Sequence, residues 1–110
     1  MTLSTHVLDA AKGRPAVGVP VVLSRRIPDG WQRLGAGVTD DDGRSSDLWL
    51  GALEPGVYRL EFDTGTYFAA TGQTGFYPEV AVVFEITDPA SHHHVPLLLS
   101  PFAYSTYRGS

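Results

Sequence analysis

Cysteine is absent from this chain of 110 residues, and Lys12 is its only lysine. The lack of cysteine excludes a disulfide framework, a thiolate nucleophile and a zinc or iron–sulfur site with cysteine ligands. With 8 basic and 12 acidic residues the formal net charge is −4, and no stripe of lysine and arginine runs along the chain. Because nucleic-acid backbones are bound by clustered positive charge, we expect no nucleic-acid partner.

Long apolar runs and a basic, apolar start are missing as well. A membrane-spanning helix needs about 20 consecutive apolar residues, and residues 1–6 do not resemble a secretory signal. We therefore expect a cytoplasmic protein without a membrane partner. Charged residues make up only 18% of the chain, below the roughly 25% of an ordinary soluble domain. This low charge predicts that partner subunits cover part of the surface.

Turn-forming residues are abundant, with Gly 12 and Pro 8, and turn signals recur about every 8–14 residues, a spacing typical of sandwiches and barrels. The stretches between them alternate in polarity, and only residues 65–71 favour a helix, of one or two turns. We predict one all-β domain over residues 1–110, a two-sheet sandwich of about eight strands with one short helix. The strands are expected at residues 3–8, 19–27, 31–38, 47–50, 57–63, 79–87, 92–99 and 103–108.

Four histidines stand out in a chain without cysteine. His6 lies in the first expected strand, and two-residue alternation places His92 and His94 on one face of the penultimate strand, with His93 on the other. A single histidine on a strand is most often a hydrogen-bonded structural residue. Two on one face with a distant third also match the ligand pattern of a catalytic zinc site. Both interpretations stay open at this point.

Arg44 and the chain end are the other candidate site features. Arg44 follows an acidic turn, residues 40–43, which lacks the ligand spacing and closing glutamate of a calcium loop. The arginine is either an exposed turn residue or part of a site. The C-terminal segment is either an edge strand with aromatic packing or the lining of a site. In the second case its polar groups are the Tyr107 phenol, the Arg108 guanidinium, and the hydroxyl and α-carboxylate of Ser110.

Taken together, three segments resemble one family closely: residues 3–9 (LSTHVLD), residues 41–44 (DDGR), and residues 92–101 (HHHVPLLLSP) running into the terminal YSTYRGS. They are similar to the 5-hydroxyisourate hydrolases, transthyretin-related enzymes of urate degradation. The terminal Tyr-Arg-Gly-Ser separates these hydrolases from the hormone-carrying transthyretins. One departure is His93, where the family usually has tyrosine. Because alternation turns His93 away from the pocket, we expect no catalytic consequence.

The resemblance implies a transthyretin-like sandwich of two four-stranded sheets with one short helix, assembled as a homotetramer, a dimer of dimers with active sites in the channel between dimers. It implies hydrolysis of the small-molecule substrate 5-hydroxyisourate to 2-oxo-4-hydroxy-4-carboxy-5-ureidoimidazoline, without a cofactor or metal. Two alternatives remain: a transthyretin-type small-molecule carrier, and a zinc-dependent cyclic amide hydrolase that uses His6, His92 and His94. Carried over by motif, the catalytic residues are His6, Arg44, His94 and Ser110, and the substrate-binding residues are His92, Tyr107 and Arg108.

These residue types suit the implied reaction. Ring opening needs a base for water, a proton donor for the leaving nitrogen and a cation for the developing oxyanion. Histidine, with an ordinary pKa near 6.5, serves the first two needs. Arg44, permanently charged and fork-shaped, serves the third and can clamp a planar ring. We expect His6 and His94 to share the acid and base roles, and which of them takes the first proton is left open.

Overall fold

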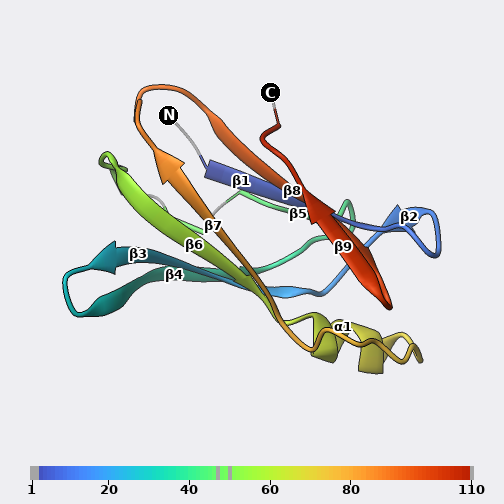
Figure 1. Cartoon of the computed structure of the whole chain (residues 1–110). Helices are drawn as coiled ribbons and strands as arrows, with labels where there is room; N and C mark the ends of the chain where they lie inside the picture. The colour runs from blue at the N-terminus through green and yellow to red at the C-terminus, as the bar shows by residue number, and fades with distance from the viewer. Residues whose placement is uncertain (1–2, 47, 50, 110) are drawn as a thin grey trace.

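Two β-sheets pack face to face in the computed structural model, which describes residues 3–46, 48–49 and 51–109 (Figure 1). The first sheet holds β1 (Leu3–Asp9), β2 (Arg14–Pro15), β5 (Arg44–Ser45), β8 (His93–Ser100) and β9 (Ala103–Thr106). The second holds β3 (Pro20–Ile27), β4 (Gly30–Val38), β6 (Gly56–Phe62) and β7 (Val80–Ile86). Helix α1 (Thr64–Ala70) joins β6 to β7. The predicted fold class, a two-sheet sandwich with one short helix, is confirmed.

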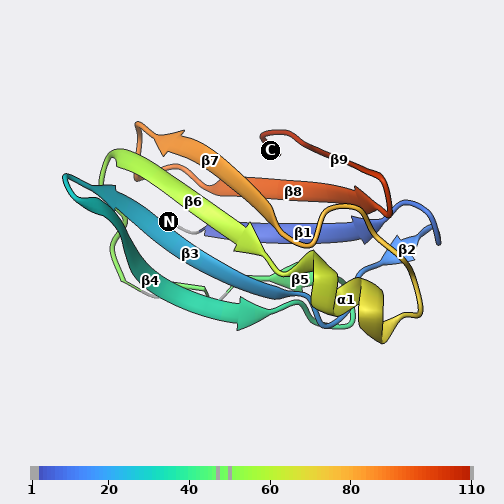
Figure 2. The ribbon, with the colours of Figure 1, turned by 60° about the horizontal axis from the view of Figure 1, so that its bottom comes forward.

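The strand order explains which segments meet. In the first sheet it is β2-β1-β8-β9, with β5 also paired to β1, and in the second it is β4-β3-β6-β7. β1 and β8 pair in parallel and lie side by side along the whole of β1 (Figure 2). The other pairs are antiparallel, including the β3–β4 hairpin that the turn at residues 28–30 predicts. The two ends of the chain therefore meet in one sheet.

Several boundaries differ from the sequence prediction. Of the strand expected at residues 47–50, positions 47 and 50 lie outside the described residues, and Leu48 and Trp49 belong to no strand. Leu48 lies in a loop but is buried in the core. Its apolar side chain is the reason that the sequence predicts a strand here. The two-residue strands β2 and β5 are too short to show any alternation. Helix α1 begins at Thr64, where Asp63 caps it by accepting a hydrogen bond from the Thr66 backbone N–H.

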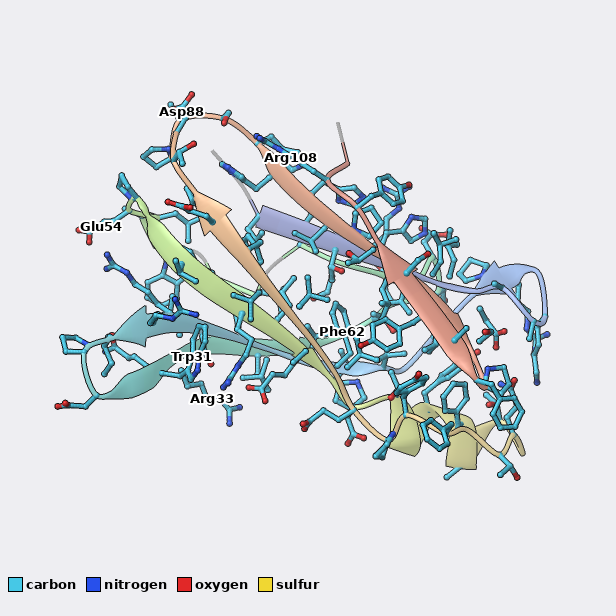
Figure 3. All side chains as sticks on the ribbon, in the orientation of Figure 1. Trp31, Arg33, Glu54, Phe62, Asp88 and Arg108 are labelled. Atoms are coloured by element: carbon cyan, nitrogen blue, oxygen red, sulfur yellow. The ribbon has the colours of Figure 1, made fainter. Side chains whose placement is uncertain are left out.

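Alternation within the strands builds the core. Tyr58, Leu60 and Phe62 of β6 are buried between the sheets, as the sequence predicts, and Figure 3 shows Phe62 among these inner side chains. Burying a side chain of this size contributes roughly 1.5–3 kcal/mol. In β1, Thr5 and Val7 face the core while Ser4 and His6 are only partly buried on the other face. The outer face of the first sheet is therefore where the polar side chains gather.

A buried carboxylate ties α1 to the first sheet. Asp9, at the end of β1, accepts hydrogen bonds from the Tyr67 hydroxyl at 2.6 Å, the Lys12 backbone N–H at 2.9 Å and the Gln73 side-chain amide at 3.2 Å. Burial acts to raise the pKa of Asp9, but these hydrogen bonds outweigh it and lower the pKa.

The part of the chain that the structure describes contains no helix with the length and the apolar character that a membrane span requires.

Candidate active site

Four predicted site residues meet on the outer face of the first sheet. The antiparallel register of β1 and β5 sets His6 opposite Arg44, and the parallel register of β1 and β8 sets Ser4 beside His94. The ring centroids of His6 and His94 are 6.5 Å apart, and those of His92 and His94 are 6.2 Å apart. The structure thus brings His6, Arg44, His92 and His94 together from three strands and a loop.

A cavity of about 340 Å³ opens at this place, lined by Ser4, Thr5, Asp40, Arg44, Ser46, His92 and His94. The acidic turn beside it has a structural role, because Asp40 Oδ1 accepts hydrogen bonds from the backbone N–H groups of Asp42 and Arg44. The bond from Arg44 is the main cause that lowers the pKa of Asp40, and the charges of Arg44 and His6 act in the same direction. The turn therefore holds Arg44 at the rim of the cavity.

His94 is the histidine whose protonation the surroundings change most clearly. Burial lowers its pKa below the ordinary value of 6.5, and the electrostatic effects of His92, His6 and Arg44 lower it further, while a hydrogen bond to the Ser4 backbone opposes them. These surroundings favour the neutral form of His94, which has a nitrogen lone pair available. A neutral imidazole beside a fixed guanidinium can accept a proton while the arginine stabilises negative charge.

The Ser4 hydroxyl lies between two of the histidines. Its Oγ is 2.8 Å from His94 Nδ1 and 3.3 Å from His92 Nε2.

Among the described residues, no group of three or more histidine, aspartate or glutamate side chains could hold a metal ion. A zinc site needs its nitrogen ligands at about 2.0–2.1 Å from one point. This arrangement gives the zinc interpretation no support.

The chain end passes beside His94. The Gly109 N–H donates a hydrogen bond to the His94 carbonyl oxygen at 2.8 Å, and a Cβ at position 109 would come within 2.5 Å of His94 Cδ2. Tyr107 and Arg108 line a second cavity of about 240 Å³, between β7 and β8, that shares His94 with the first; Figure 3 shows Arg108 near the start of β8. Ser110 lies outside the described residues.

His93 points the other way, as alternation predicts. Its side chain is buried between the sheets with 5% exposure, and its Nδ1–H donates to the Ser91 carbonyl oxygen at 3.0 Å. It contributes to the wall of the second cavity and not to the first.

Comparison with known proteins places this arrangement in a family. A family model described as HIUase/Transthyretin family matches residues 3–109. The chain belongs to this family. A 5-hydroxyisourate hydrolase of Salmonella typhimurium is 50% identical over 109 residues, which cover 98% of this chain and 80% of that protein.

Solved structures of the family share the fold without separating its functions. The 5-hydroxyisourate hydrolase of Klebsiella pneumoniae has a TM-score of 0.87 at 40% identity and covers 100% of both chains. Sea bream transthyretin, solved in complex with thyroxine, has a TM-score of 0.90 at 40% identity and covers 97% of this chain and 93% of its own. An enzyme and a hormone-binding protein are thus equally good structural matches, so the site residues must decide the function.

Sequence reasoning assigned no role to two residues that the structure places at the site of this family member. Ser4 shares the outer face of β1 with His6, which was a usable signal, but its contact with His94 depends on pairing across 90 positions. Gly109 was visible only as one letter of the terminal motif. Its contact with the His94 ring could not be read from local pattern, because the segment after β9 forms only an isolated bridge to β8.

Proposed function

We propose that this chain hydrolyses 5-hydroxyisourate to 2-oxo-4-hydroxy-4-carboxy-5-ureidoimidazoline. The observation that carries the proposal is the partly buried His94 ring, whose centroid lies 6.5 Å from that of His6, on a cavity that Arg44 also lines. Relatives at 50% identity that bear the name 5-hydroxyisourate hydrolase support the same activity.

The chemistry follows from the positions of these groups. One histidine takes a proton from water, and the water oxygen adds to a carbonyl carbon of the six-membered ring. The carbonyl oxygen becomes an oxyanion beside the Arg44 guanidinium, which stabilises its charge. The bond between that carbon and the ring nitrogen then breaks, and the nitrogen takes up a proton from histidine. His6 and His94 divide the acid and base work, and Ser110 is proposed as a further catalytic group.

Substrate binding is assigned to residues around the rim. His92 lines the cavity beside His94, and its ring lies nearly parallel to the His94 ring, at an interplanar angle of 17°. Tyr107 and Arg108 belong to the adjoining cavity that shares His94. We assign all three to binding of the planar substrate.

We also propose that the chain works as a homotetramer, a dimer of dimers. Large apolar side chains are exposed in the single subunit, among them Phe102 at 70%, Phe76 at 69% and Val83 at 51%. Exposed apolar surface of this kind marks protein interfaces. The cytoplasmic location expected from the sequence stays a prediction.

The decisive experiment generates 5-hydroxyisourate from urate with urate oxidase and follows its decay by absorbance. Wild-type protein should accelerate the decay, and His94→Asn should lose the acceleration by at least about 10²-fold, since a general base or acid contributes that much. Arg33→Ala is the matched control, because Arg33 is exposed on β4 of the second sheet. Unaccelerated decay with wild type would refute the function, and near-native turnover of His94→Asn would refute the site.

A transthyretin-type carrier is the second candidate, because the sea bream transthyretin structure holds thyroxine on the same fold. A carrier would bind its ligand without consuming it. Removal of residues 108–110 should leave the ligand binding of a carrier intact. The same truncation of a hydrolase should give a folded protein without activity.

A further inference from the structure

One hydroxyl group contacts two of the three histidines at the site. Ser4 Oγ lies 2.8 Å from His94 Nδ1 and 3.3 Å from His92 Nε2. The parallel pairing of β1 with β8 sets Ser4 directly beside His94, so the backbone of two central strands fixes this contact. A hydroxyl held in this way on rigid elements can determine the state of the rings it touches.

The number of hydrogens limits how both contacts can be made. A serine hydroxyl carries one hydrogen and can donate to only one nitrogen at a time. When it donates to His92 Nε2, it accepts from a protonated His94 Nδ1. When it donates to His94 Nδ1, it accepts from a protonated His92 Nε2. Because Oγ also has two lone pairs, both rings can donate to it at once, but they cannot both accept from it. The tautomer of one ring therefore restricts the tautomer of the other.

The remaining contacts of the His94 ring identify its reactive atom. Nδ1 faces the Ser4 hydroxyl, the ring is also hydrogen-bonded to the Ser4 backbone, and the Cγ–Cδ2 side faces Gly109, where an added Cβ would lie 2.5 Å from Cδ2. The edge that stays available to a substrate contains Nε2. If Nδ1 carries the proton, Nε2 has a lone pair and acts as a base; if Nδ1 accepts from Ser4, Nε2 carries the proton and acts as an acid.

We propose that Ser4 is a positioning residue whose single hydroxyl hydrogen couples the protonation of His94 to that of His92. This inference rests on the proposed hydrolysis and deepens it. His94 begins as a base at Nε2, with its Nδ1–H bonded to Ser4 and the Ser4 hydrogen directed to His92. The ring changes from base to acid without turning, because Nδ1 keeps the same partner in both states.

The proton transfer balances. Water loses a proton to His94 Nε2 while its oxygen adds to the substrate carbonyl carbon. The Nδ1 proton of His94 passes to Ser4 Oγ, and the Ser4 hydroxyl hydrogen passes to His92 Nε2. The positive charge thereby moves from partly buried His94 to exposed His92, where water stabilises it better. The transfer runs in reverse when the leaving ring nitrogen takes its proton from His94 Nε2.

Kinetics with Ser4 variants test the role. Ser4→Ala should lower kcat by about tenfold to a hundredfold, as loss of a group that orients a reactive histidine does, with KM within about threefold of wild type. Ser4→Thr keeps a hydroxyl on an outward strand position that tolerates β-branched residues, and it should recover most of kcat. Ser100→Ala also loses one hydroxyl hydrogen bond, to the Ala103 carbonyl oxygen outside the cavity, and should match wild type.

A spectroscopic measurement on the free protein separates positioning from direct contact with the substrate. Histidine ¹⁵N spectra report which ring nitrogen carries the proton, and Ser4→Ala should change the tautomers of both His92 and His94, whereas Ser100→Ala should not. Unchanged kcat in Ser4→Ala, or a raised KM with unchanged histidine spectra, overturns the proposal. If wild type fails to hydrolyse 5-hydroxyisourate but Ser4→Ala still alters both rings, the proposed function fails and the coupling stands.

Discussion

Position 109 has no room for a side chain. A Cβ at this position would lie 2.5 Å from His94 Cδ2 and 3.1 Å from Cγ, well inside van der Waals contact. The same residue donates its N–H to the His94 carbonyl oxygen. A glycine is therefore required for the chain end to rest against the ring that we assign as base and acid.

Gly109→Ala should lower kcat/KM by about tenfold to a hundredfold, because a displacement of about 1 Å in a reacting group can have that effect. Either the His94 ring turns or the segment from Tyr107 onward lifts away. Ser105→Ala is a suitable control, since Ser105 pairs with Leu98, four positions from His94. The assay is the decay of 5-hydroxyisourate, and unchanged kcat/KM would show that neither the ring nor the chain end is held by this contact.

Alternation along single strands was enough to place the histidines on their faces. It put His6 outward on β1 and separated His92 and His94 from His93, and the structure agrees. Alternation does not show which residue of a neighbouring strand each histidine will contact. The contact of Ser4 with His94 needs the register of a parallel pair formed by the two ends of the chain, and no local pattern encodes that register.

At the scale of elements, α1 is held to the first sheet through Asp9. Burial and the hydrogen bond to Asp9 raise the pKa of Tyr67, so the phenol stays protonated and donates to the carboxylate. The pKa of Asp9 is lowered from its ordinary 3.8. A lowered pKa means that folding favours the ionised form. The resulting stability is present above pH 3.8 and is lost as the pH falls through the lowered value.

Tyr67→Phe should therefore lower the free energy of unfolding by roughly 1–3 kcal/mol at pH 7, the usual effect of losing a hydrogen bond to a buried charge. The difference from wild type should shrink in acid, below the ordinary pKa of aspartate, as Asp9 becomes protonated. Urea unfolding at several pH values measures both effects. Tyr77→Phe is the matched control, since among the described residues the Tyr77 hydroxyl has no hydrogen bond. An equal loss in both variants would point to packing alone.

Elements were predictable where the chain is long enough to show a period. The side chains of β6 from Val57 onward, and those of β7 over its seven residues, alternate between more buried and less buried positions. Arg59 and Glu61 in β6 and Glu85 in β7 mark the less buried face in the sequence. The two residues of β2 and the two of β5 cannot alternate; they exist because β1 offers free backbone groups along its edge. β5 nevertheless carries Arg44, so one of the proposed catalytic residues sits on an element that periodicity could not reveal.

On the scale of the whole molecule, the low fraction of charged residues has a counterpart in the structure. Phe76, Tyr77, Phe102 and Tyr104 form an aromatic patch. The Tyr77 ring meets the Phe76 and Tyr104 rings edge-on, each at a centroid distance of 5.0 Å, and the Phe76 N–H donates to the Pro101 carbonyl oxygen. The edge-on contacts fix the Phe76, Tyr77 and Tyr104 rings relative to one another, and Phe102 lies in the turn between β8 and β9. A fixed apolar surface with a net charge of only −4 favours association over repulsion between copies.

The double variant Phe76→Ser/Phe102→Ser should consequently form smaller assemblies than wild type. These two rings are 69% and 70% exposed in the single subunit, so their removal leaves the core intact while it takes apolar area from an interface. Val38→Ser, at an apolar position 59% exposed on the second sheet, is the control and should leave the assembly unchanged. Light scattering coupled to size exclusion measures the mass, and the hydrolase assay is run on the same fractions. If the sites lie between dimers, activity should fall together with the mass. A double variant that keeps both the wild-type mass and activity would remove the patch from the interface.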